Sequence, residues 1–481
     1  MVAVFEAKST LCSSTHGRAA KVSLTLGGHD TPHDMPVMPM RTVWACAAAD
    51  ESDAESGMAH APRASNGTAA RRMRMCMGFS IHASRIPMPS PHLQHWTLDR
   101  EVVFLNHGSY GAVPTVIQER QEMWRKELER EPVRYMRVQR PQQTDAARVA
   151  AARFLGADPA GIVLVPNATH GVNSVLRSLR FAPGEELLVT DHEYNACRNA
   201  LNFVAERWGA KVVVVTIPFP LKSAQEVVDA VLAQVTPRTT LCLVDHITSA
   251  TALVMPVERL VPALQKAGVR VLVDGAHAPG QVAVDLTRLG ADFWTGNLHK
   301  WPCAPKGCAV LYGDARHREA IRPTVISHGA SADFSQRSRY HQEFDWEGTF
   351  DPTAWACIPD VIEFLGALVP GGWAEIRRRN RALALEAREL LHAGLGTEPV
   401  CPAEMVGSMA SIRLPAQLHR RLQERGVSLF GELIDRWKIE IPNIGWPGPV
   451  GEMVRISCHL YNAREDYEKL LAALRALERG D

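Results

Sequence analysis

The 481-residue chain contains no apolar run approaching the roughly 20 residues that a membrane-spanning helix requires. It also has almost no net charge, because 53 Lys and Arg residues face 52 Asp and Glu residues. Composition therefore gives no electrostatic reason to expect binding to nucleic acid or to an anionic membrane. The ten cysteines include no Cys-x-x-Cys pair and no cluster with metal-ligand spacing. Cysteines scattered in this way indicate a reducing compartment, and we expect a cytoplasmic protein.

Residues 1–94 lack the periodic patterns of helices and strands. They are rich in Arg, Ser, Ala and Met, as in the run at 73–77. We expect this part to be a disordered extension, a targeting segment for an organelle, or an over-long start that precedes Met77 as the first residue. Asp50 and Glu51 argue against a transit peptide, because such peptides contain few acidic residues.

From residue 95 onward, short β-branched runs alternate with helical patterns. Strands are predicted at 187–190, 212–217, 241–244, 271–273 and 307–312, and helices at 146–155, 171–180, 195–208, 223–235 and 257–267. Strands that are apolar on both faces predict an α/β fold with a mostly parallel sheet, of the seven-stranded type, covered by helices. A long charged helix at 373–392 and strands at 408–414 and 453–457 predict a smaller α+β domain. We place the large domain at 95–355, with its first segment packing beside the small domain, and the small domain at 356–481.

Polar residues follow four predicted strands, at Asp191–Tyr194, Asp245–His246, Asp274–His277 and Asn297–Lys300. Ligands of open parallel sheets bind beyond the carboxyl ends of the strands, so these groups are expected to meet at one edge. Lys300 and Asp274 fit pyridoxal phosphate (PLP), whose aldehyde needs a lysine amine and whose pyridine nitrogen needs a carboxylate. The alternatives are that Asp274 caps the next helix and that Lys300 is an ordinary surface lysine.

Three further segments are candidates for the same cleft. Thr169 opens a helix after the strand at 162–165, where a hydroxyl and free amides suit a phosphate; simple capping of the helix by Thr169 is the alternative. Arg455 offers two donors to the carboxylate of an amino acid, or forms a surface ion pair. Asn106 lies in a Gly-containing loop that either lines the cleft or forms a tight turn.

Together these motifs resemble the fold-type I PLP enzymes of the class V aminotransferase family, and within it most closely the isopenicillin N epimerases. The segments that carry the resemblance are 105–111, 190–196, 273–280, 290–301, 347–349 and 454–462. The resemblance covers nearly all of 95–481 and leaves the N-terminal part uncovered. It implies a PLP-dependent enzyme that acts on an amino acid through an α-carbanion.

The resemblance also implies a role for each matching position. Lys300 matches the Schiff-base lysine, Asp274 the partner of the pyridine nitrogen, and Arg455 the binder of the substrate carboxylate, with Asn106 beside it. The other cofactor contacts implied are His277 and Ser249 near the ring, His192 or Tyr194 stacked on it with His192 preferred, and Thr169, His170, Asn297 and His299 at the phosphate. Thr349 matches a phosphate contact from the other subunit, which implies a homodimer with shared sites.

The reaction itself is left open by the sequence. We expect epimerisation first, with Tyr194 or His192 as the second acid, then β-elimination of sulfur by a cysteine desulfhydrase-type lyase, then transamination; a non-catalytic PLP-fold protein is a remote alternative. Desulfurase chemistry is disfavoured because residues 444–452 contain no cysteine before Arg455. The loop at 249–252 ends in Ala252 where the family often has glycine, so we expect it to be shaped differently.

Overall fold

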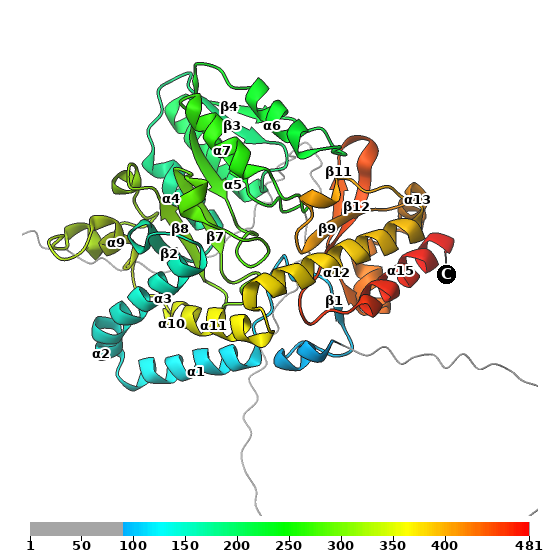
Figure 1. Ribbon diagram of the computed structural model, residues 1–481, viewed down its shortest axis with the longest axis horizontal. Helices are drawn as coiled ribbons and strands as arrows, with labels where there is room; N and C mark the ends of the chain where they lie inside the picture. The colour runs from blue at the N-terminus through cyan, green and yellow to red at the C-terminus, as the bar shows by residue number, and fades with distance from the viewer. Residues whose placement is uncertain (1–89, 481) are drawn as a thin grey trace, which may run out of the picture. The chain divides into compact units, whose positions relative to one another are not determined.

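A seven-stranded sheet occupies the middle of the chain in the computed structural model, which describes residues 90–480 (Figure 1). Its strands lie in the order β2-β8-β7-β6-β5-β3-β4. Their bounds are β2 Ile162–Val165, β3 Glu186–Thr190, β4 Lys211–Val215, β5 Thr239–Asp245, β6 Arg270–Asp274, β7 Phe293–Asn297 and β8 Ala309–Gly313. The run from β7 to β4 is parallel, and β8 is antiparallel to β7 and to β2. The predicted mostly parallel α/β sheet is confirmed.

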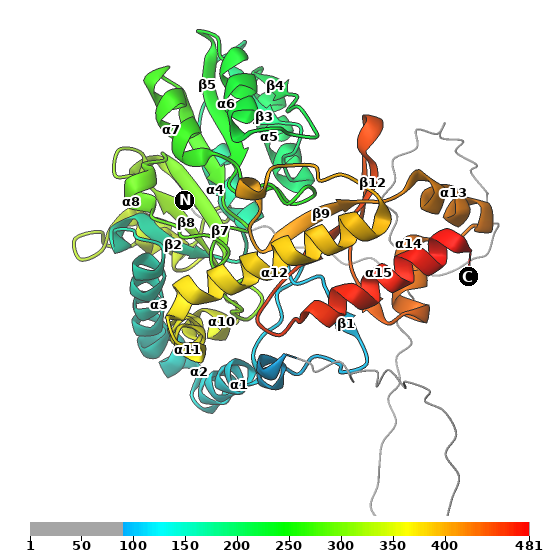
Figure 2. The same ribbon diagram turned by 45° about the vertical axis from the view of Figure 1, so that its right-hand side comes forward.

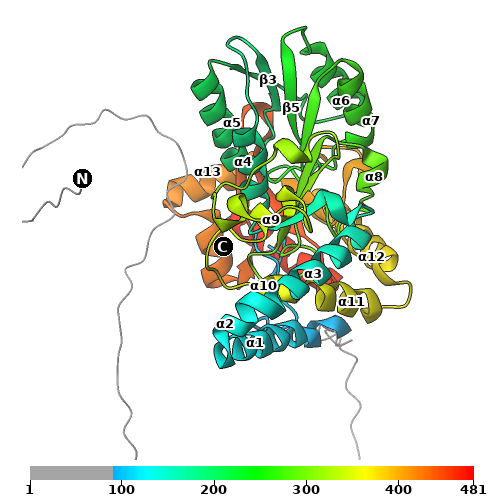
Figure 3. The same ribbon diagram turned by 90° about the vertical axis from the view of Figure 1, so that its left-hand side faces the viewer.

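Alternate residues of each central strand pack into opposite hydrophobic layers, as the two-residue period of a strand requires. On β3, Leu188 belongs to the layer that includes α3 Arg140–Phe154, α6 Ala224–Ala233 and α7 Val257–Lys266. Its neighbours Leu187 and Val189 belong to the layer of α4 Ala168–Ser178 and α5 Asn195–Trp208. Figure 3 shows α4 and α5 on one side of β3 and β5, and α6 and α7 on the other. Both faces are thereby buried, which explains the continuous apolar strands.

The C-terminal part forms a second, smaller sheet of order β11-β12-β9. Its strands are β9 Met409–Arg413, β11 Asn443–Trp446 and β12 Gly451–Ser457, all antiparallel. Two helices, α12 Gly372–Leu395 and α15 Arg464–Arg479, pack against each other, and α12 runs from the neighbourhood of α11 to β9 (Figures 1 and 2). A short parallel pair, β1 Val103–Phe104 with β10 Ile439–Glu440, joins the first described strand to this part.

The remaining helices connect these layers. They are α1 Thr115–Arg130, α2 Pro132–Arg134, α8 Leu286–Leu289, α9 Arg339–Phe344, α10 Thr353–Ala356, α11 Ile358–Leu368, α13 Ala416–Arg425 and α14 Leu429–Gly431. No single described helix is long and apolar enough to cross a membrane; α10 and α11 meet that test only jointly with α12, at a bend of 69°. The described residues, 90–480, all fall in one compact unit, so the boundary at 355/356 stays a prediction. The expectation for residues 1–94 lies outside the described residues, apart from 90–94.

Candidate active site

The carboxyl ends of the central strands surround a cavity of about 530 Å³. Its walls come from residues that follow β2, β3, β5, β6 and β7, as the positions of the polar motifs predicted. Eight of the predicted residues line it: Thr169, Tyr194, Ser249, Asp274, His277, Asn297, His299 and Lys300. Five others do not: Asn106, His170, His192, Thr349 and Arg455. The strand ends therefore deliver most of the expected side chains to one place.

Lys300 lies just beyond β7 and reaches the cavity with its amine. Its Nζ lies 3.0 Å from Nε2 of His277, which follows β6. Burial, and then the positive charge of Arg455, lower the pKa of Lys300 to about 7. Burial, together with the charge of Lys300, holds the pKa of His277 well below its usual range, so the imidazole is neutral. A partly neutral amine beside a neutral imidazole is suited to nucleophilic and proton-transfer chemistry.

Asp274 ends β6 and is 2% exposed. Its Oδ1 accepts a hydrogen bond from the amide of Ala276 (2.9 Å), and its Oδ2 accepts one from Sγ of Cys197 (3.1 Å). Burial raises the pKa of Asp274, while these bonds and the charge of Lys300 favour the carboxylate. Each carboxylate oxygen has two acceptor sites, so Asp274 retains the capacity to accept a bond from a cationic ring nitrogen in the cavity.

The N-terminus of α4 forms another wall. Its cap is Asn167, whose Oδ1 accepts from the amide of His170 (2.8 Å), so the alternative that Thr169 caps the helix is wrong. Asn297 accepts from the amide of Ala168 (2.8 Å) and so connects β7 to the start of α4. The backbone amide of His170 is thus already engaged. The side chain of His170 points away from the cavity, with its Nε2 3.2 Å from Oε1 of Glu347. Thr169 itself lines the cavity, in the first turn of α4.

Tyr194, rather than His192, reaches the cavity from the loop after β3. The ring of His192 packs 4.4 Å from that of Trp446 and 5.1 Å from that of Phe219. Its Nδ1 lies 2.7 Å from the hydroxyl of Thr251, and burial lowers its pKa to about 4. The preference for His192 over Tyr194 as the stacking residue therefore does not fit the geometry.

Arg455, on β12, is 4% exposed and forms no salt bridge with a carboxylate of residues 90–480. The alternative of a surface ion pair is wrong. Its Nη2 donates to Oγ of Ser109 (3.0 Å), and its Nη1 donates to the carbonyl of Ser249. Both serine residues line the cavity, so Arg455 lies directly behind its wall. Burial lowers its pKa to about 10, and the guanidinium stays charged at neutral pH.

The loop that carries Ser249 ends at Ala252, which has φ 58°. That is the left-handed conformation that glycine favours. Ala252 therefore adopts the backbone conformation that a glycine would adopt at this position. The expectation that this loop is shaped differently does not fit its conformation at Ala252.

Asn106 and Thr349 lie outside the cavity for different reasons. Asn106 accepts a hydrogen bond from Oγ of Ser109 (2.6 Å) and so acts on the loop rather than facing the cavity. Thr349 is exposed and lines a separate cavity of about 720 Å³ with Val133, Arg140 and Trp346.

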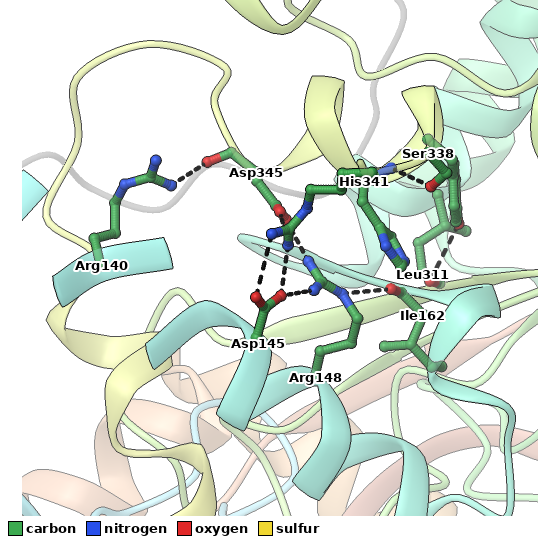
Figure 4. Close-up of polar contacts among 10 residues, drawn as sticks. Arg140, Asp145, Arg148, Ile162, Leu311, Ser338, His341 and Asp345 are labelled. Carbon is green, nitrogen blue, oxygen red and sulfur yellow. Dashed lines mark hydrogen bonds and ion pairs between the residues drawn. The ribbon is translucent and has the colours of Figure 1, made fainter. Parts of the chain in front are cut away.

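The segment before Thr349 is anchored to α3 by a partly buried charge network (Figure 4). Arg148 binds both Asp145 and Asp345, and its Nε donates to the carbonyl of Ile162 (3.0 Å). Arg140 also donates to the carbonyl of Asp345 (2.6 Å). These contacts hold Asp345, four residues before Thr349, against α3 of the same chain.

Two groups near Lys300 were not predicted. His107 places Nε2 3.0 Å from the carbonyl oxygen of Lys300 and Nδ1 2.6 Å from the hydroxyl of Tyr461. Gly111 packs so closely on the same backbone that a Cβ there would lie 2.4 Å from the Lys300 carbonyl oxygen. The Gly-containing motif at 105–111 was the available signal, but its contact with Lys300 depends on the tertiary fold.

The cavity fits PLP in its chemistry. It presents an amine with a lowered pKa, a buried carboxylate and a hydroxyl at a helix N-terminus. Two buried polar atoms of its lining residues, Nδ1 of His277 and Nδ1 of His299, have no hydrogen-bond partner among residues 90–480. Buried polar atoms are normally satisfied, so their lack of partners indicates that a polar ligand belongs here.

Comparison with known proteins agrees. The chain matches the family Aminotransferase class-V over residues 102–470. Isopenicillin N epimerase of Amycolatopsis lactamdurans is 34% identical over 397 residues, which cover 80% of this chain and 97% of that protein. A probable chloroplastic L-cysteine desulfhydrase of Arabidopsis thaliana is 31% identical over 409 residues, covering 79% and 84%. The chain belongs to the class V aminotransferase family, and it is an enzyme whose cofactor is PLP.

Solved structures share the fold. The cystine C-S lyase C-DES, in complex with its product cysteine persulfide, has a TM-score of 0.64 at 23% identity, covering 78% of this chain and 97% of that one. The cysteine desulfurase CsdA of Escherichia coli has a TM-score of 0.63 at 21% identity, covering 80% and 96%. Another C-DES structure holds glycine covalently linked to its PLP cofactor. The predicted fold type I is confirmed.

Proposed function

We propose that the protein epimerises an amino acid or an amino-acid-containing substrate, with Lys300 as the residue that binds PLP covalently. The observation that carries this proposal is the placement of Lys300 and Tyr194 on one cavity. The two residues follow β7 and β3, with β6 and β5 between them in the sheet. Epimerisation needs two proton-transferring groups that approach the same carbon from different sides, and this arrangement offers two.

When bound, PLP supplies an electron sink that makes the α-proton of an amino acid removable at neutral pH. Asp274 would pair with the ring nitrogen and keep it protonated. We assign the substrate carboxylate to Arg455, because a guanidinium offers a carboxylate two parallel bonds. Its Nη atoms donate to Ser109 and Ser249 of the cavity wall, so a bound carboxylate would take the place of these two partners. Lys300, with a pKa of about 7, takes the α-proton at Nζ, and the neutral His277 beside it can share that proton.

Tyr194 is proposed to return a proton from the other side. Its side chain is 47% exposed, and burial of the rest raises the pKa of its hydroxyl above the usual value, so it remains a proton donor at neutral pH. The remaining cofactor contacts are assigned to residues that line the cavity. His277 and Ser249 would lie near the ring, and Thr169, Asn297 and His299 around the phosphate.

A sulfur lyase that eliminates a β-thiol is the second candidate, favoured by the desulfhydrase relatives and by C-DES among the solved structures. Desulfurase chemistry is disfavoured because the seven cysteines of residues 90–480 are all buried, so this part of the chain offers no accessible thiol to accept sulfur. Buried free thiols are also in keeping with the proposed cytoplasmic location.

The test is incubation of the purified enzyme with a panel of L-amino acids in deuterated water. Epimerisation predicts α-deuteration together with the D-isomer. Formation of pyruvate and sulfide from cysteine, without the D-isomer, would overturn the epimerase assignment in favour of a lyase. A keto acid accompanied by a shift of the cofactor to its amine form would indicate transamination.

We also propose a homodimer in which Thr349 contacts the phosphate in the partner subunit. The support is its location, since Thr349 lies on a separate exposed cavity of its own chain, beside Val133, which is 71% exposed. Exposed apolar side chains around a cavity are typical of a surface that another chain covers.

A further inference from the structure

Three carboxyl groups that lie close together are buried, and two of them, Asp245 and Asp274, line the cavity. Asp245 and Asp274 end the neighbouring strands β5 and β6, are paired in register, and are each 2% exposed. Glu193 follows β3, which pairs with β5 on its other side, and is 9% exposed. Its carboxyl group contacts that of Asp245, and it lies within 4.8 Å of Sγ of Cys197 and the carboxylate of Asp274.

Hydrogen-bond donors are distributed unequally among the three. Asp274 receives two donors, the amide of Ala276 and the thiol of Cys197. Both oxygens of Glu193 and Oδ2 of Asp245 are buried and find no side-chain donor among residues 90–480. Two ionised carboxylates in contact repel each other, whereas a proton on one of them turns the contact into a hydrogen bond.

Few positive charges face this group. Lys300 acts on Asp245 and Asp274, and Arg198 of α5 acts on Glu193. The thiols of Cys197 and Cys242, which also face Glu193, are kept neutral because burial raises their pKa values. Burial, and then repulsion from Asp245 and Asp274, hold the pKa of Glu193 well above its usual range. With so few positive charges nearby, the three carboxyl groups are best accommodated when one of them is protonated.

We propose that Glu193 carries a proton at neutral pH and uses it to donate a hydrogen bond to Asp245, so that Asp274 alone is left to pair with the pyridine nitrogen of PLP. Glu193 is a positioning residue, because it acts through Asp245 and Asp274. The proposal rests on the assignment of Asp274 to the ring nitrogen. The proton itself, however, is measurable without turnover, so its absence is distinguishable from a failure of the proposed function.

Infrared spectroscopy of the holoenzyme tests the proton directly. Wild-type protein should show the carbonyl stretch of a protonated carboxylic acid at neutral pH. The band should shift when glutamate, but not aspartate, is labelled with carbon-13. It should vanish in Glu193→Gln and persist in Glu206→Gln, a matched substitution at an exposed position of α5. A band that is missing from wild type, or one that shifts only with labelled aspartate, would overturn the proposal.

Thermal unfolding supplies a second measurement. A protonated Glu193 has a folded pKa above the unfolded value of about 4.5, so the unfolded chain binds fewer protons above that pH, and stability falls as pH rises. Glu193→Gln cannot lose this proton. The Tm of Glu193→Gln relative to wild type should therefore increase from pH 5 to about pH 8, while Glu206→Gln stays level with wild type. A difference that does not change with pH would contradict a protonated Glu193.

Discussion

His107 donates a hydrogen bond from Nε2 to the carbonyl oxygen of Lys300, at 3.0 Å. A carbonyl oxygen only accepts, so Nε2 carries the hydrogen and Nδ1 must accept from the hydroxyl of Tyr461, 2.6 Å away. Burial, and then the charge of the neighbouring His459, hold the pKa of His107 well below its usual range, so this tautomer does not gain a second proton at neutral pH. The main chain at Lys300 is thereby connected to segments near both ends of the described chain.

Tyr461→Phe removes the hydroxyl that donates to Nδ1 of His107 and keeps the aromatic ring. Nδ1 of His107 then becomes a buried acceptor with no donor, which should lower the free energy of unfolding by about 1–3 kcal/mol. Urea denaturation of the holoenzyme measures the loss. Phe104→Leu, beside the same ring, is a control for packing alone. Unchanged stability in Tyr461→Phe would show that the hydroxyl does not hold His107.

The pKa of Lys300 predicts an opposite pH dependence to that of Glu193. Its folded value of about 7 lies below the ordinary 10.5, so the unfolded chain binds more protons between these values and stability rises with pH there. In protein freed of cofactor, the Tm advantage of Lys300→Met over wild type should shrink as pH increases from 7 to about 10. An advantage that is constant over this range would mean that the amine titrates normally.

Arg455 should determine substrate affinity through the geometry of its two donors. Arg455→Lys keeps the charge but loses the fork, and KM should increase by at least about tenfold, the equivalent of ~1.4 kcal/mol. The cofactor absorbance spectrum without substrate should change little, since Arg455 is assigned to the carboxylate. A variant with wild-type KM for an amino acid would exclude that role. Arg413→Lys, on the neighbouring strand β9, is the matched control.

The shared site predicts complementation between two inactive chains. Lys300→Ala and Thr349→Ala are co-expressed with different tags, and the mixed dimer is isolated. If Thr349 serves the partner's site, one site of the mixed dimer carries both defects and the other carries none, so activity should return to about half of wild type per dimer. Mixed dimers no more active than Thr349→Ala alone would place Thr349 in its own chain's site. A monomer in sedimentation would also contradict the proposal.

Part of the fold and site follows from local sequence. Asp274 and Lys300 could be located because each follows an apolar strand, and carboxyl ends of parallel strands meet at one edge. The choice between Tyr194 and His192 could not be made in this way. Both residues lie in the loop after β3, where side-chain directions follow neither the helical nor the strand periodicity. The ring of His192 packs against Phe219 and Trp446, which are distant in sequence.

The proximity of Glu193 to Asp245 was also beyond local reasoning. It depends on β3 lying beside β5, although β4 lies between them in the chain. The link between His107 and Lys300 is similar, since it joins residues 193 positions apart. Such contacts follow from strand order and tertiary packing. These depend on the whole chain and not on any local segment of the sequence.

The central claim is that PLP is bound covalently through Lys300. Borohydride reduction of the holoenzyme, followed by peptide mapping with mass spectrometry, tests it most directly. The account predicts that the reduced cofactor is attached to the peptide containing Lys300 and that Lys300→Ala protein yields no labelled lysine. A label on another lysine, or an equal yield of label from Lys300→Ala, would contradict it.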